Sequence, residues 1–150
     1  MPYDQKFVAI RPAMVSDAEE LYALIAKRRS WLSGLKWAAS ATLESTRAHL
    51  EHAIWNEKFR LVTYNTAIVG VITLRGDKDN YCIGYWSAAY RRRGMMSYAV
   101  SLFLRWIREP IAATVREQNI ASLTILQQND FEIVDVSDGW VTLNRAGFLL

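Results

Sequence analysis

The stretch AYRRRGMMSYAV, residues 89–100, places three arginines and a glycine directly before a run of apolar residues. That run is apolar on nearly every side, so we expect a buried helix from Met95 to Ile107. A short basic loop that leads into a helix directs main-chain N–H groups and the positive end of the helix dipole toward an anion. Gly94 lets the main chain approach such an anion closely, because glycine has no Cβ. The pattern alone leaves two interpretations open, a phosphate-binding loop and a solvated basic turn.

Short strands and two helices precede this stretch, and no repeat or linker interrupts them. We predict a first strand over residues 7–11, which Pro12 ends, and a helix that begins at the capping box of Ser16 and Glu19. Residues 28–41 have no clear period and are expected to be irregular, and Thr42 can cap a second helix that runs to about Asn56. Three further strands are predicted over residues 60–64, 67–74 and 81–86.

After the apolar helix, the pattern continues with a strand over residues 111–115 and a helix over residues 119–128. The apolar stripe of this helix comprises Ile120, Leu123 and Leu126. Strands over residues 131–136 and 140–143 flank Asp138-Gly139, a pair that suits the positive φ angles of a type I′ hairpin turn. The predicted order is therefore β, α, α, β, β, β, α, β, α, β, β.

The composition is that of a single globular domain, which we expect to span residues 1–150. Hydrophobic residues make up 51% of the chain, yet no uncharged apolar run is long enough to cross a bilayer. The amino terminus lacks the apolar core of a secretion signal, so we expect a cytoplasmic protein with no membrane partner. The single cysteine, Cys82, cannot form an internal disulfide, and the two histidines lack the spacing of a metal site, so we expect no metal.

The net charge of +3 comes from 18 basic and 15 acidic residues, which alternate along most of the chain. Such mixing indicates a solvated surface. Arg91, Arg92 and Arg93 are the exception, but they form a cluster rather than a stripe, and the helix behind them is too apolar to lie on a nucleic acid. We therefore expect no nucleic-acid partner and favour an anion pocket in front of a buried helix.

Together with the order of the elements, several segments resemble the GCN5-related N-acetyltransferase (GNAT) family. Residues 91–96, RRRGMM, match the first four positions of the family's pyrophosphate loop, Gln/Arg-x-x-Gly-x-Gly/Ala. Residues 119–131 resemble its segment Asn-x-x-Ser-x-x-x-Leu-x-x-x-Gly-Phe, in the version of the branch that acetylates ribosomal-protein amino termini, the RimJ/RimL type. Residues 10–12 (IRP), with Asp17 nearby, and residues 83–86 (IGYW) also look like that branch.

The resemblance covers residues 7–143 and implies the GNAT fold, an α+β (α/β) architecture. In this fold a mixed central sheet of about six to seven strands is combined with four helices. The implied cofactor is acetyl-CoA, with CoA as the product and without a metal.

The resemblance also implies which residues contact acetyl-CoA. Main-chain amides of the loop and of the helix start would hold the diphosphate, from Arg91, Arg92, Arg93, Gly94, Met95, Met96 and Ser97. Tyr85, Trp86 and Ser87 would pair with pantetheine and offer an N–H to the acetyl oxygen, which is the logic of an oxyanion hole. Asn119 would bond the pantetheine arm as well as cap a helix. Ser122 either contacts the thiol region or only caps the helix or faces solvent.

The chain departs from the family pattern at four positions. Met96 replaces a small residue of the loop, so its side chain either crowds the diphosphate or packs into the core. Asp130 replaces the glycine before Phe131, so an aspartate must take the positive φ of the helix end. Many relatives have a glutamate base where this chain has Cys82, and a tyrosine acid where it has Leu126.

Acetyl transfer requires a neutral amine nitrogen, and an α-amino group with a pKa of about 8 is already partly neutral at neutral pH. The demand on a catalytic base is therefore low, and a water can serve. Cys82 is a candidate catalytic residue by position only, since a free cysteine is more often a small buried hydrophobic residue. Ser122 is the other candidate catalytic residue.

The segment between the first two helices borders the acceptor amine in the family. Here it carries five basic residues and one acid, namely Lys27, Arg28, Arg29, Lys36, Arg47 and Glu44. Such a rim repels polycations and favours a neutral or acidic acceptor, such as a peptide amino terminus. Trp31 and Trp37 either line the substrate pocket or close the edge of the core.

The resulting hypothesis is an acetyl-CoA-dependent N-acetyltransferase that acts on a primary amine, with a peptide or protein N-terminal α-amino group as the expected acceptor, by direct attack on the thioester. The alternative is a catalytically weakened acyl-CoA-binding or partner-binding module, which the missing glutamate and tyrosine and the presence of Met96 favour. The sequence leaves open the identity of the acceptor, the length of the acyl chain, and whether the protein is a monomer or a homodimer.

Overall fold

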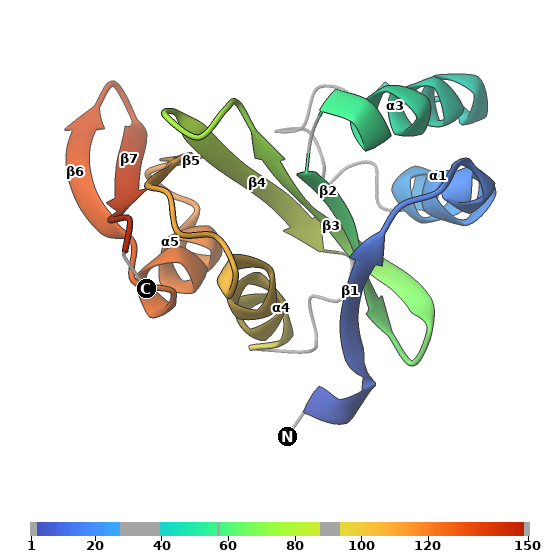
Figure 1. Cartoon of the computed structure of the whole chain (residues 1–150), viewed down its shortest axis with the longest axis horizontal. Coiled ribbons are helices and arrows are strands. Elements are labelled where there is room, and N and C mark those ends of the chain that lie inside the picture. Colours follow the sequence, from blue (N-terminus) through green and yellow to red (C-terminus); the bar gives the residue numbers. More distant parts are fainter. Residues whose placement is uncertain (1–2, 28–39, 57, 88–93, 149–150) are drawn as a thin grey trace.

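The computed structural model describes residues 3–27, 40–56, 58–87 and 94–148, and its centre is one seven-stranded sheet (Figure 1). The strands are β1 (Val8–Pro12), β2 (Lys58–Tyr64), β3 (Ala67–Arg75), β4 (Tyr81–Ser87), β5 (Ile111–Arg116), β6 (Glu132–Ser137) and β7 (Trp140–Arg145). Their order in the sheet is β1-β2-β3-β4-β5-β7-β6. Among the described strands, only β4 and β5 pair in parallel, so the sheet is mixed, as predicted.

Four α-helices lie in the described parts of the chain: α1 (Ala18–Lys27), α3 (Leu43–Asn56), α4 (Met95–Leu104) and α5 (Ile120–Gln128). Helices α1 and α3 cover one face of the sheet, and α4 and α5 cover the other (Figure 1). Each face therefore has its own hydrophobic core. The predicted element order, the mixed sheet and the number of helices are confirmed.

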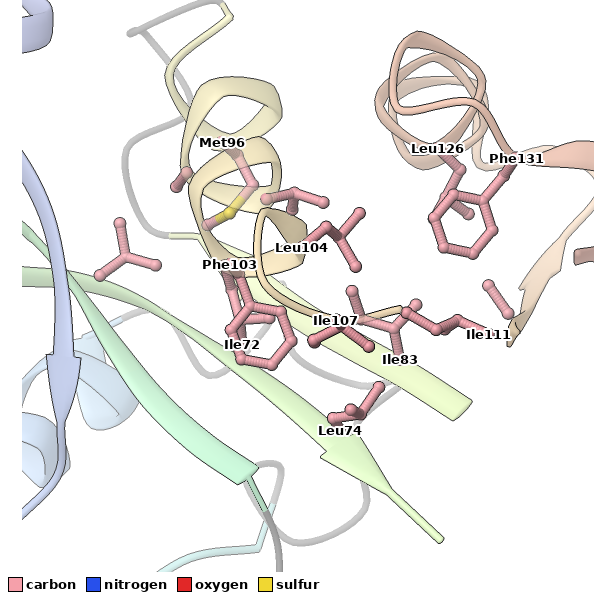
Figure 2. Close-up of a cluster of buried hydrophobic side chains, with 14 of the residues drawn as sticks. Ile72, Leu74, Ile83, Met96, Phe103, Leu104, Ile107, Ile111, Leu126 and Phe131 are labelled. Carbon is pink, nitrogen blue, oxygen red and sulfur yellow. The ribbon is translucent and has the colours of Figure 1, made fainter. Parts of the chain in front are cut away.

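Helix α4 is the buried helix that the sequence predicts, although it ends at Leu104 rather than at Ile107. Figure 2 shows Met96, Phe103 and Leu104 in one cluster with Ile72 and other residues of the sheet. Burying a side chain of this size contributes about 1.5–3 kcal/mol, so α4 is held in place mainly by its apolar contacts. Of the two alternatives for Met96, the structure supports packing into the core.

The beginning of α1 differs from the prediction. A 3₁₀ turn over Val15–Asp17 precedes the helix, and the carboxylate of Asp17 accepts the main-chain N–H of Met14 at 2.8 Å. The same carboxylate forms two hydrogen bonds with the guanidinium of Arg11, at 2.8 and 2.9 Å. The predicted capping box of Ser16 and Glu19 is therefore wrong, because the Asp17 carboxylate takes the capping role.

Other local predictions agree with the structure. Thr42 and Ser45 cap each other at the start of α3, since each side-chain oxygen accepts the main-chain N–H of the other residue. Asp138 and Gly139 take the predicted positive φ angles of 55° and 82° between β6 and β7. Asp130 takes a φ of 69° after α5, so aspartate does replace the family's glycine there.

The apolar stripe of α5 is only partly covered, contrary to the prediction. Leu126 is completely buried and Leu123 packs at the edge of the core, but Ile120 is 66% exposed. The reason is tertiary: β6 is the last strand of the sheet and every residue in it is exposed, so the core ends before it reaches Ile120.

Candidate active site

Strands β4 and β5 pair at their beginnings and then separate. Their parallel register contains only Tyr81 with Ile111 and Cys82 with Ala112. On its other side, β4 stays paired with β3 as far as Ser87, and β5 stays paired with β7 as far as Arg116. Residues 83–87 of β4 therefore have no strand partner in β5. Their main-chain groups are placed to bond a ligand inserted between the two strands.

The helix that follows begins without a capping side chain among the described residues. Gly94 is the N-cap residue of α4 with a φ of 84°, and none of the described side chains caps this end. The N–H of Tyr98 bonds to the carbonyl oxygen of Gly94 at 3.0 Å, whereas the amides of Met95, Met96 and Ser97 lie in the first turn, where no intrahelical acceptor exists. The side chains of Met95 and Met96 are buried, so these two residues can offer a ligand only their main chain.

A hydroxyl pair connects β4 to α5 beyond the point where β4 and β5 separate. The phenol oxygen of Tyr85 lies 2.8 Å from Oγ of Ser122 and 3.2 Å from the carbonyl oxygen of Ser122. Asn119 is the N-cap residue of α5, because its side-chain oxygen accepts the N–H of Ser122 at 3.2 Å. The cap thus fixes the turn that carries the Ser122 hydroxyl.

Burial raises the pKa of Tyr85 to about 12, although the hydrogen bond with Ser122 acts in the opposite direction. The phenol therefore keeps its proton at neutral pH. If Tyr85 donates that proton to Oγ of Ser122, the serine hydroxyl proton is free to point toward a third group.

A pocket of about 140 Å³ lies on the opposite face of β3 and β4. Paired residues of the two strands share this face, and the pairs are Val71 with Trp86, Thr73 with Gly84 and Arg75 with Cys82. Val71 and Trp86 belong to the core under α1 and α3, which identifies the face. We call this feature the β3/β4 pocket.

Cys82 is an exposed thiol at the edge of this pocket. Desolvation raises the pKa of the Cys82 thiol, while the charge of Arg75 lowers it by less. A raised pKa keeps the thiol protonated near pH 7, which does not suit a general base. Leu126, at the position of the family's tyrosine acid, is completely buried and carries no proton to donate.

The sequence-predicted residues thus fall into separate groups. Tyr85, Asn119 and Ser122 meet between β4 and α5, and the start of α4 lies on the same face of the sheet. The side chain of Trp86 lies on the other face, against the β3/β4 pocket. Trp31 and Trp37, like Arg91, Arg92 and Arg93, lie outside the described residues.

Two features of the site were not predicted from the sequence. One is the contact between Tyr85 and Ser122, which are 37 positions apart in the chain. The other is the part that Thr73 and Arg75 play in the pocket. The sequence carried a signal only for Thr73 and Arg75, because side chains two positions apart on a strand share a face.

Two further observations concern the described residues only. None of their His, Cys, Asp and Glu side chains gather in a group of three that could hold a metal ion. Among the helices found there, none is long and apolar enough to cross a membrane.

Comparison with known proteins places this geometry in a family. A family model for the acetyltransferase (GNAT) domain matches residues 8–132. A search of curated proteins finds no significant match.

Solved structures with the same fold include three acetyltransferases. The RimL ribosomal L7/L12 alpha-N-protein acetyltransferase in complex with coenzyme A aligns with a TM-score of 0.82 at 22% identity, covering 93% of this chain and 94% of that one. The microcin C7 self-immunity acetyltransferase MccE, in complex with acetyl-CoA and AMP, aligns at 0.79 with 16% identity, covering 93% and 92%. The ribosomal-protein-S5-alanine acetyltransferase of Vibrio fischeri aligns at 0.78 with 16% identity, covering 97% and 96%.

These likenesses are too distant in sequence to establish more than the fold. The family match covers most of the chain, however, and its range includes both the separating strands and the helix that begins at Gly94. On this evidence the chain belongs to the GNAT family of acetyltransferases.

Proposed function

We propose that this chain, acting as a single domain, transfers an acetyl group from acetyl-CoA to a primary amine, and that the amine is the N-terminal α-amino group of a peptide or protein. The observation that carries the proposal is the separation of β4 from β5 after Cys82 and Ala112, beside a helix whose first turn is capped by none of the described side chains. An elongated ligand with a diphosphate at one end and a thioester at the other fits that arrangement.

The residues present fit acetyl-CoA on physical grounds. First-turn amides and the positive end of the helix dipole stabilise a diphosphate, and the left-handed conformation of Gly94 suits a residue with no Cβ. The edge of β4 that does not pair with β5, at residues 83–87, can bond the amide groups of pantetheine, and the amide nitrogen of Asn119 can donate to the same arm. When bound, acetyl-CoA supplies a thioester carbonyl that an amine can attack.

Ser122 is the proposed proton donor. With the Tyr85 hydroxyl donating a hydrogen bond to Oγ, the hydroxyl of Ser122 can donate a hydrogen bond to the departing sulfur, while Tyr85 keeps its own proton and holds the serine in place. A thiol has a pKa of about 8.5, so the departing thiolate is a weak base and needs only modest help. We therefore assign Ser122 a moderate catalytic role and Tyr85 a positioning role.

The proposed acceptor needs little help from a base. An α-amino group with a pKa of about 7.7–8.0 is roughly one-tenth neutral near pH 7, whereas a lysine amine of pKa about 10.4 is almost entirely charged. The described site offers the Cys82 thiol where relatives have a glutamate, and a protonated thiol cannot accept a proton. An acceptor that is already neutral in part suits such a site best.

The test measures thiol release from acetyl-CoA with peptides, lysine derivatives and polyamines as acceptors, and CoA binding by calorimetry. Replacement of Ser122 by alanine should lower kcat by about 10- to 100-fold and leave the Kd for CoA unchanged. Ser101→Ala is the matched control, because Ser101 is a partly buried helical serine whose hydroxyl donates to the carbonyl oxygen of Tyr98, at 2.6 Å. Equal effects of the two replacements would contradict the role of Ser122.

CoA binding without turnover on any amine would favour the alternative, a catalytically weakened acyl-CoA-binding module. The observation in favour of that alternative is the loss of both usual proton-transfer groups, at Cys82 and at the buried Leu126.

A further inference from the structure

One side chain ties the end of α5 to the beginning of α4, which lie side by side on one face of the sheet (Figure 1). Asn129 is the C-cap residue of α5 and is only 9% exposed. Its amide nitrogen lies 3.2 Å from the carbonyl oxygen and 3.3 Å from Oγ of Ser97, in the first turn of α4. The same nitrogen lies 2.9 Å from the carbonyl oxygen of Ile125.

These contacts determine the orientation of the Asn129 amide. Two of the three oxygens around its nitrogen belong to main-chain carbonyl groups, which can only accept a hydrogen bond. The NH₂ group must therefore face Ser97 and Ile125. Oγ of Ser97 accepts a hydrogen bond from Asn129 and does not donate one to it.

The Ser97 hydroxyl keeps its own proton available. A serine hydroxyl has one proton to donate, and its oxygen can accept a hydrogen bond at the same time. None of the described residues accepts the Ser97 proton. In contrast, the hydroxyl of Ser101, one turn further along α4, donates to the carbonyl oxygen of Tyr98 at 2.6 Å. Ser97 thus differs from Ser101 in having a donor that can serve a ligand.

The position of Ser97 directs this donor toward the start of α4. The Cα–Cβ bonds of an α-helix tilt toward its amino terminus. Ser97 is partly exposed, whereas the side chains of Met95 and Met96, which precede it in the first turn, are buried. Of these three residues, only Ser97 can offer an anion its side chain as well as its main-chain amide.

We propose that Asn129 is a positioning residue for the cofactor. It holds Oγ of Ser97 as an acceptor, so that the Ser97 hydroxyl donates a hydrogen bond to the diphosphate of CoA. This inference rests on the proposed function, which puts the diphosphate at the start of α4. It adds a side-chain ligand for the diphosphate and the residue that orients this ligand.

Asn129 would also relate the two ends of the cofactor to each other. Ser122 and Asn129 are seven positions apart at opposite ends of α5, which corresponds to about 10 Å along a helix. Ser122 is the proposed donor to the departing sulfur, and Asn119 and Tyr85 hold it independently of Asn129. Loss of the bond to Ser97 should therefore weaken CoA binding more than it slows turnover.

The test is a double-mutant cycle on the Kd for CoA, measured by calorimetry. Ser97→Ala should raise this Kd about 10- to 100-fold, because it removes a hydrogen bond to a charged group. Asn129→Leu removes the amide but keeps a side chain of similar size, and it should raise the Kd about tenfold. The double variant should stay within about twofold of Ser97→Ala, since Asn129 acts through the Ser97 hydroxyl. Two effects that multiply independently would overturn the proposal.

Ser101→Ala and Thr46→Val are the matched controls. Ser101 carries a hydroxyl of the same helix, and Thr46 is completely buried in α3, where its hydroxyl donates to the carbonyl oxygen of Thr42 at 2.7 Å. Both controls should leave the Kd for CoA within about twofold, although Thr46→Val, like Asn129→Leu, should lower the unfolding free energy. Asn129→Leu with lower stability and unchanged CoA affinity would overturn the proposal, because its role would then be structural only.

Asn129→Asp keeps the inference testable should Asn129→Leu fail to fold. The aspartate side chain has the shape of the amide, but its carboxylate accepts the Ser97 proton and thereby withholds it from the diphosphate. This variant should bind CoA at least as weakly as Ser97→Ala. An affinity equal to that of the native protein would overturn the proposal.

Calorimetry also separates this inference from the proposed function, because CoA binding requires no turnover. The expected Kd values in a protein that acetylates no amine would support the role of Asn129 and contradict the transferase. Equal Kd values for the native protein and all variants of an active enzyme would reject the role of Asn129 alone. A native protein that binds no CoA would overturn both.

Discussion

Tyr85→Phe removes one phenol oxygen from the contact between β4 and α5 and keeps the ring. The pKa of Tyr85 rises from an ordinary value of 10.0 to about 12 in the folded protein, chiefly because the phenol is buried. A rise of this size corresponds to about 2.7 kcal/mol of unfolding free energy. Because the folded-state pKa is the higher one, this stability is fully present below pH 10.0 and is lost as the pH rises toward 12.

The native protein should therefore be the more stable of the two at neutral pH, and Tyr85→Phe the more stable at high pH. Near neutral pH, Tyr85→Phe should lower the unfolding free energy by about 1 kcal/mol, the usual value for one hydrogen bond. At pH about 11, roughly half of the 2.7 kcal/mol is gone, so native protein and variant should be about equally stable. At higher pH the variant should be the more stable protein.

Urea denaturation followed by circular dichroism, at a series of pH values from neutral to strongly alkaline, measures this difference. Tyr22→Phe on α1 is the matched control for the loss of one phenol from the other face of the sheet. Absorbance titration of tyrosinate in the native protein and in Tyr85→Phe gives the pKa of Tyr85 directly. A stability difference that stays constant across the series, or a Tyr85 that ionises at an ordinary pKa, would refute the reasoning.

Two further replacements test how the fold holds the site. Gly70→Ala should lower the unfolding free energy by about 1–3 kcal/mol and weaken CoA binding. The reason is that the added Cβ would lie 2.5 Å from the carbonyl oxygen of Trp86 and 2.9 Å from Cε of Met96. Chemical denaturation measures the loss of stability, and calorimetry measures the CoA affinity. Asp17→Asn should cost about 1 kcal/mol at neutral pH, because Asp17 loses its charge-assisted bonds with Arg11. The Arg11 guanidinium lowers the pKa of Asp17 below the ordinary aspartate value of 3.8. The difference in unfolding free energy between the native protein and Asp17→Asn should therefore be full above pH 3.8 and vanish as the pH falls below the lowered pKa. Acid denaturation curves of the two proteins measure this difference.

The order of elements could be predicted because its signals are local. Hydrophobic period, glycine and proline identify each strand and helix within a few residues, and pairs such as Asp138-Gly139 act through their own backbone angles. The prediction from local sequence failed where a distant part of the chain determined the local structure. The start of α1 depends on Arg11 of β1, and the exposure of Ile120 depends on where the sheet ends.

The candidate site was predictable only in part, for the same reason. A glycine before an apolar helix indicates an anion site without knowledge of the fold. The contact of Tyr85 with Ser122 requires α5 to pack beside β4, which no short segment encodes. The β3/β4 pocket requires the register of β3 against β4. The sequence shows which side chains share a face of one strand, but not which strand lies beside it.

The two sides of the candidate site follow from the alternation of β4. Ile83 and Tyr85 lie on the face of α4 and α5, and Gly84 and Trp86 lie on the face of α1 and α3. Continuous pairing with β3 fixes this register, and a slip of one residue would exchange the two faces completely. A cofactor bound along the free edge of β4 would therefore have the hydroxyl pair on one side and the β3/β4 pocket on the other. The register of β4 against β3 therefore decides which of its side chains can meet Ser122 and which line the β3/β4 pocket.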